Sequence, residues 1–331
     1  MIKKTALWLV LLMLTAGQAI ACYGNDLWPG LSKSSRSALT APLSKDVFAT
    51  GRFFKVTKDG KSSFLFGTMH APPLGKLRMP ETVVSRLRKS KVLFVEVTNP
   101  AEKAFFGDIR KYGSEFLAKS PTGFHRQFSA EEWHFVRRVT KTAGLTNDIL
   151  QLARPWYVYM QMSSLGCGRP NPNKRPIMDA KIEQIARGAG LRVRGLETPL
   201  QAIQSMQGFS AGEYAAMIRA ELFSFQASDP GDMYLTRLNM YHRGDIQLIW
   251  QLQMQQFAGF GDPKAIGLIT KLWQDRMLGK RNTAWLPALR KALAKGDAFV
   301  AVGALHLGGK HGLMRSLQRD GYKVTRIKFR Y

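Results

Sequence analysis

The stretch FLFGTMH, residues 64–70, runs strand-like apolar residues into a glycine and places a histidine three positions later. The same pattern returns near the other end of the chain as FVAVGALH, residues 299–306. Aromatic and β-branched residues predict two strands that end near Gly67 and Gly303. Because glycine lets the backbone turn sharply, we expect His70 and His306 to project from the ends of these strands.

Each G-x-x-H turn is followed by a helical pattern and then by another strand pattern, KVLFVEV after the first turn and YKVTRIKF after the second. Such a unit is a βαβ crossover with its histidine at the carboxyl end of the first strand. Ligands bind at that end of open α/β sheets. If both units share one sheet, the two histidines should converge on one crevice.

The wider pattern predicts an α/β fold, with a mixed sheet built around two strand-GxxH-helix units and a large α-helical insertion. Strands are expected at residues 53–56, 63–67, 92–97, 191–196, 298–303 and 322–328. Helices are expected at residues 80–89, 108–118, 130–143, 155–164, 178–189, 211–227, 233–242, 246–257, 265–278, 282–294 and 308–320. No linker divides the chain, so we expect a single domain over residues 22–331.

Two glutamates close apolar strand patterns, Glu96 in VLFVEVTNP and Glu197 in LRVRGLETP. An ionised carboxylate in such a place is costly unless it is paired or bound to a cation. Two imidazoles and a carboxylate in one crevice form either a metal site or an acid/base pair. The plainer interpretation has the acids reaching solvent or capping turns, and the histidines serving as core residues.

The N-terminal segment MIKKTALWLVLLMLTAGQAIA has the basic start, apolar middle and A-x-A end of a secretory signal, so residues 1–21 are expected to be removed. The product would be periplasmic or secreted. A lipoprotein anchored at Cys22 is the alternative. The two cysteines, Cys22 and Cys167, form one disulfide in the simplest case, or stay as unrelated thiols.

Removing residues 1–21, which carry two lysines and no acid, lowers the formal charge from +26 to +24. This surface should attract an acidic polymer or an anionic membrane surface, or simply be well solvated. No dense Lys/Arg block with interleaved aromatics occurs, so the chain carries no specific nucleic-acid signature.

The letters GFSAG, residues 208–212, match a G-x-S-x-G nucleophile turn but follow a helical pattern instead of a strand. Ser210 and Glu213 are better explained as a capping box that opens the next helix.

Several blocks, in order, resemble the TraB/PrgY/GumN family: FLFGTMH, VLFVEV, ARPWYVYMQ, MDAKIEQIARGAGLRVRGLETPLQ, YHRGD, GKRNTAWLPAL and AFVAVGALHLGGKHGLMRSLQRDGYKV. The resemblance spans nearly the whole chain after the signal segment. That family is similar to the Tiki metalloproteases and, more distantly, to erythromycin esterase-like proteins. It implies an α/β core in which the paired turns and an acid bind a divalent metal and hydrolyse an amide or similar bond.

Carried over by position, the resemblance puts the first turn on Gly67 and His70, the acid on Glu96, and the second turn on Gly303 and His306. The LET block places Glu197, and the RN block places Arg281 and Asn282. The start ACYGNDL resembles exported members with paired cysteines, which favours the Cys22–Cys167 disulfide.

These observations predict an exported metal-dependent hydrolase, peptidase-like, acting on a peptide or related amide bond. His70, His306 and Glu96 would hold manganese, cobalt or zinc, and no nucleotide cofactor is expected. Glu197 would serve as general base or orient a histidine, and Arg281 with Asn282, at the opening of a helix, would stabilise an oxyanion. The alternatives are a non-catalytic binding protein for a peptide or acidic polymer, and a metal-independent ester hydrolase.

Overall fold

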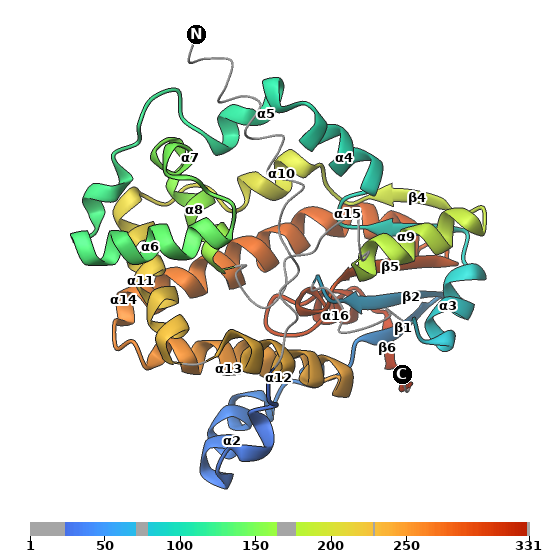
Figure 1. Cartoon of the computed structure of the whole chain (residues 1–331). Helices are drawn as coiled ribbons and strands as arrows, with labels where there is room; N and C mark the ends of the chain where they lie inside the picture. Colours follow the sequence, from blue (N-terminus) through green and yellow to red (C-terminus); the bar gives the residue numbers. More distant parts are fainter. Residues whose placement is uncertain (1–23, 71–78, 164–176, 228, 330–331) are drawn as a thin grey trace.

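The computed structural model describes residues 24–70, 79–163, 177–227 and 229–329 (Figure 1). The expected signal segment and both cysteines of the expected disulfide lie outside these residues. Among the helices described, none is both long and apolar enough to cross a membrane.

A six-stranded mixed sheet forms the centre of the molecule, in the order β4-β3-β5-β2-β1-β6. Strands β4, β3, β5 and β2 are mutually parallel, and β1 pairs antiparallel with both β2 and β6. The strands are β1 (Phe53–Lys58), β2 (Lys61–Thr68), β3 (Val92–Val95), β4 (Arg192–Gly195), β5 (Ala298–Gly303) and β6 (Lys323–Arg326). All six predicted strands are confirmed, and so is the mixed sheet.

The helices are α2 (Lys33–Thr40), α3 (Glu81–Arg88), α4 (Asn99–Gly107), α5 (Ile109–Phe116), α6 (Ala130–Thr142), α7 (Asn147–Leu152), α8 (Pro155–Ser163), α9 (Met178–Gly188), α10 (Pro199–Gln204), α11 (Ala211–Ala227), α12 (Pro230–Arg243), α13 (Ile246–Ala258), α14 (Pro263–Thr270), α15 (Arg281–Leu293) and α16 (Leu313–Arg319). The sequence prediction missed α2, α4, α7 and α10, which are all short. The sequence does indicate where two of these helices, α4 and α10, begin, because Thr98 and Thr198 each cap a helix that has proline in its first turn.

Strand β5 lies at the centre and is buried at every position. Its alternate residues face two separate apolar clusters, as a period of two requires. Val300 and Val302 pack with residues of α15 and α16, while Phe299 and Ala301 pack with residues of α3 and α9. The sheet is therefore covered by helices on both faces, which is the layered arrangement of an α/β fold.

The predicted helical insertion is present as a separate apolar cluster. It draws buried residues from α4, α6, α8, α11 and α14, which belong to two chain segments on either side of α9 and β4. Figure 1 shows α6, α8, α11 and α14 together beside the sheet, whereas α4 lies nearer to β4. Within them, Ser210 and Glu213 exchange the two hydrogen bonds of a capping box, so the Ser210 hydroxyl serves the start of α11 as predicted.

The prediction of two helices with an opening at Arg281 is wrong. A π-helical stretch, η4 (Lys271–Lys280), continues α14 directly into α15. No proline interrupts this run before Pro287, and Gly279 is tolerated in it. Arg281 and Asn282 therefore do not stand at a free helix N-terminus, and only their side chains are available to the site. The helix expected from Gly308 begins later, at Leu313.

Candidate functional site

The two G-x-x-H turns lie against each other at the carboxyl edge of the sheet. They end neighbouring parallel strands, and Thr68 of β2 lies opposite Gly303 of β5. A methyl group on Gly67 would meet the Cα of Ala304 at 2.8 Å, and one on Gly303 would meet His70 Nε2 at 2.9 Å. Each turn glycine thus makes room for the other turn: Gly67 for the backbone of Ala304, and Gly303 for the ends of the His70 and Glu96 side chains.

Glu96 lies at the junction of the turns, immediately after β3. Its Oε1 accepts a hydrogen bond from the Gly303 backbone N–H at 2.6 Å. The same oxygen lies 3.4 Å from His70 Nε2 and 3.7 Å from His306 Nε2. Burial acts to raise the pKa of Glu96, but the hydrogen bond from His70 and the positive charges of His70 and Arg281 hold that pKa well below its usual range. Glu96 is therefore an ionised carboxylate between two imidazoles.

Arg281 joins the two predicted glutamates. Its Nη2 donates to Glu96 Oε2 at 2.6 Å and also to Glu197, whose two oxygens accept from Arg281 Nε at 2.9 and 3.2 Å. The indole N–H of Trp285 donates to Glu197 Oε2 at 3.2 Å, and the Arg281 guanidinium lies over the Trp285 ring. Glu197 is thus engaged in holding Arg281, and the described contacts do not give it the expected role of orienting a histidine.

Asn282 fixes the tautomer of buried His306. Its amide nitrogen donates to the carbonyl oxygens of His306 and His311 at 3.1 and 2.8 Å, so its Oδ1 is the atom that faces His306 Nδ1 at 2.7 Å. Nδ1 must then carry the proton, and the lone pair on Nε2 points toward Glu96 and Arg281. Burial lowers the pKa of His306 to about 3, so the ring is neutral.

Sequence reasoning assigned no role to Asp179, which holds the other histidine. Its Oδ2 lies 3.1 Å from His70 Nδ1, and its Oδ1 accepts from the Thr68 hydroxyl at 2.7 Å. The negative charge of Asp179 raises the pKa of His70 well above its usual range. The only signal was an acid in the first turn of α9, which is equally typical of an ordinary helix start.

The family follows from the sequence comparison. The family model described as the TraB/PrgY/gumN family matches residues 53–326. The chain belongs to this family. The matched region runs from β1 to β6 and so contains both turns, Glu96, Glu197 and Arg281. A comparison with curated proteins gives no match.

In this TraB/PrgY/gumN member the donor types fit a divalent cation. His70 Nε2 and His306 Nε2 lie 3.4 and 3.7 Å from Glu96 Oε1, near the distance of about 3.4 Å between two tetrahedral ligands at zinc bond lengths. Glu96, Glu197 and Asp179 also outnumber Arg281 and the protonated His70 by one charge, which favours an added positive charge.

Arg281 nevertheless prevents His306 from acting as a metal ligand in this structure, because its Nη1 lies 3.3 Å from His306 Nε2. In the described part of the chain, no three His, Cys, Asp or Glu side chains are arranged around a common point as metal ligands. The residues therefore match a metal site in the chemistry of their donor atoms but not in their present arrangement, and Arg281 would have to leave His306 for that nitrogen to become a ligand.

Proposed function

We propose that this protein is a metal-dependent hydrolase that cleaves a peptide or a related amide bond. The observation that supports the proposal most strongly is that two histidines from separate G-x-x-H turns face one oxygen of a buried glutamate. His70, His306 and Glu96 would hold the ion, with manganese, cobalt or zinc as the candidates. Such an ion would supply a Lewis acid that activates water and polarises a carbonyl group.

The other residues of the site prepare it for a substrate. Asn282 keeps the Nε2 of His306 unprotonated, and Asp179 fixes the ring of His70. Arg281 carries guanidinium donors into the site and is proposed to stabilise negative charge on the substrate oxygen. Glu197 and Trp285 hold the guanidinium in place, so we assign Glu197 the positioning of Arg281.

A metal-independent ester hydrolase is the second candidate, and the pair formed by Asp179 and His70 favours it. A carboxylate on Nδ1 orients an imidazole so that Nε2 can move a proton, and the His70 side chain is 52% exposed and within reach of a substrate. In this alternative Arg281 would stabilise the oxyanion without a metal. A non-catalytic peptide or polymer binder would use the same edge of the sheet and show no turnover.

One assay separates these functions. The protein is incubated with a library of fluorogenic peptides and with an activated nitrophenyl ester, with manganese, cobalt, zinc or a chelator. A metal-dependent peptidase cleaves peptides only with metal, and Glu96→Gln lowers the rate on the order of 100-fold while the fold is retained. Glu131→Gln, which changes an exposed glutamate of α6, is the matched control and should keep full activity.

Ester cleavage that persists in the chelator and is lost in Glu96→Gln would replace the peptidase with the esterase. Peptide binding without turnover under every condition would contradict both enzymes and favour the binding protein.

A further inference from the structure

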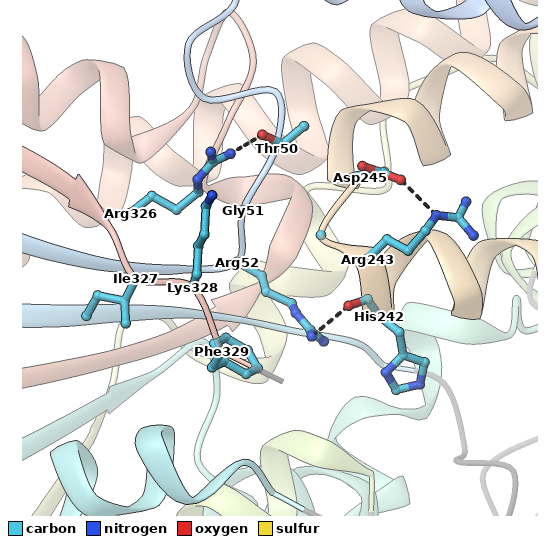
Figure 2. Close-up of a pocket in the computed structure, with 11 residues that line it drawn as sticks. Thr50, Gly51, Arg52, His242, Arg243, Asp245, Arg326, Ile327, Lys328 and Phe329 are labelled. Carbon is cyan, nitrogen blue, oxygen red and sulfur yellow. Dashed lines mark hydrogen bonds and ion pairs between the residues drawn. The ribbon is translucent and has the colours of Figure 1, made fainter. Parts of the chain in front are cut away.

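A second hollow lies at the same edge of the sheet, between the start of β1, the end of α12 and the residues that follow β6 (Figure 2). Its volume is about 590 Å³, within the range of small-molecule sites. None of the residues assigned to the proposed hydrolytic site lines it.

The lining of this pocket is strongly basic. Arg52, Arg243, Arg326 and Lys328 contribute positive charges, and Asp245 is its one carboxylate. Asp245 accepts a hydrogen bond from Arg243 at 2.9 Å, so its negative charge mainly neutralises the charge of Arg243. The remaining excess of positive charge favours an anionic ligand.

Arg52 forms a rigid floor for such a ligand. It is buried, its Nη2 donates to the His242 carbonyl oxygen at 2.9 Å, and its guanidinium lies 4.6 Å from the ring centroids of Tyr241 and Phe329. Holding the guanidinium in advance reduces the entropy lost when a ligand binds. Figure 2 shows Arg52 reaching across the pocket toward His242.

Arg326 and Lys328 supply the more exposed side of the pocket. They are two residues apart in an extended segment, because Ile327 between them donates its backbone N–H to the Phe53 carbonyl oxygen. Side chains two apart on such a segment point the same way. In Figure 2 both extend toward Thr50 and Gly51, and Arg326 hydrogen-bonds the Thr50 hydroxyl. Two cations therefore meet at one rim.

We propose that this pocket binds a phosphate group. A phosphate carries more than one negative charge and several acceptor oxygens, so it can engage both Arg326 and Lys328 at the rim, while Arg52 adds positive charge to the same pocket. The volume of the pocket suits a compact phosphate-bearing group better than a nucleic-acid duplex. The proposal does not depend on the hydrolase, because it uses different side chains.

The test is calorimetric titration of the protein with pyrophosphate at low and moderate salt. The double variant Arg326→Ala/Lys328→Ala should lose affinity about tenfold or more, because two charged contacts are removed. Lys323→Ala is the matched control, since it removes a cation from the other face of the same β6 segment. It should change the affinity less than about twofold, which reflects only long-range charge.

Sedimentation with vesicles distinguishes the two sources of phosphate. If the pocket takes a free phosphate compound, pyrophosphate binds and the double variant binds anionic phospholipid vesicles as the unmodified protein does. If the pocket takes a lipid headgroup, the vesicles bind more tightly than pyrophosphate, and the double variant weakens that binding. The proposal is overturned if neither probe binds, or if Lys323→Ala loses as much affinity as the double variant.

Discussion

At the scale of single residues, the site depends on the missing side chain of a glycine as much as on the polar side chains that are present. Gly303 brings its backbone N–H to Glu96 and leaves the space that His70 Nε2 fills. The side-chain amide of Asn282 has two functions. Its nitrogen donates to two carbonyl oxygens, and its oxygen fixes the proton of His306 on Nδ1. Small changes at these positions should affect the site more than the fold.

We predict that Gly303→Ala disables the site. The added methyl would lie 2.9 Å from His70 Nε2 and 3.2 Å from Glu96 Oε1. Both side chains would therefore have to move away from residue 303. Overpacking of this kind costs about 1–3 kcal/mol of stability, which a folded domain can absorb. The proposed peptide hydrolysis should fall at least tenfold, measured beside the urea unfolding curve.

Gly188→Ala is the matched control, because a methyl there meets no atom within 4 Å. It should leave hydrolysis unchanged. Equal activity in Gly303→Ala and the unmodified protein would show that contact between the two turns is not needed.

Most residues of the candidate site could be predicted from the sequence, because a glycine or an acid at the end of an apolar strand is a local signal. The exceptions depend on contacts between distant segments. Asp179 reaches His70 from a helix more than a hundred residues away, and its position at the start of α9 carries an ordinary explanation. The bridge from Arg281 to Glu96 and Glu197 is equally long-range, and no local pattern shows it.

At the scale of elements, the continuous run of α14, η4 and α15 decides which groups reach the site. Because η4 continues into α15 without an end, the backbone at Arg281 lies inside a helix and cannot serve as an oxyanion hole. π-Helical turns are frequent at functional sites, and this one directly precedes the two residues that contact Glu96 and His306. Hydrophobic periodicity predicts helices here but does not separate a π-helical stretch from an α-helix.

The helical part also holds a buried acid, Glu221 of α11. Burial raises the pKa of Glu221 from 4.5 to about 7, and Arg237 and Tyr159 only partly oppose the shift. A raised pKa in the folded state means that folding favours the protonated form. Stability from this group is therefore complete below pH 4.5 and is lost as the pH rises through 7.

We predict that the advantage of the unmodified protein over Glu221→Gln falls by about 2–3 kcal/mol between pH 5 and pH 8. Glutamine cannot titrate, so the difference between the two proteins isolates this group. Urea unfolding of both proteins at the two pH values gives the number. A difference that does not change with pH would mean that Glu221 titrates alike in the folded and unfolded chains.

At the scale of the whole molecule, the order of the strands explains why two distant turns meet. The sheet places β5, near the end of the chain, between β2 and β3, so Gly303 and His306 come beside Gly67 and Glu96. The sequence predicts the strands and the shared edge, since the six strand patterns are strong. Strand order and the composition of the helical part depend on packing between segments and could not be derived from periodicity.

The net positive charge also acts at this scale. The sequence predicts attraction to anions but not where on the surface they bind, because composition gives the number of charges and not their positions in the fold. The fold gathers four cationic side chains from three separate segments around one pocket.

Calorimetric titration of the purified protein with manganese, cobalt and zinc tests whether the two turns share one divalent metal. His70→Ala and His306→Ala are titrated beside it, each checked for an intact fold by circular dichroism. His134→Ala is the control, because it removes an exposed histidine from α6. We expect binding near one equivalent that is lost in both turn variants and kept in the control. Metal binding that survives in both folded turn variants would contradict this expectation.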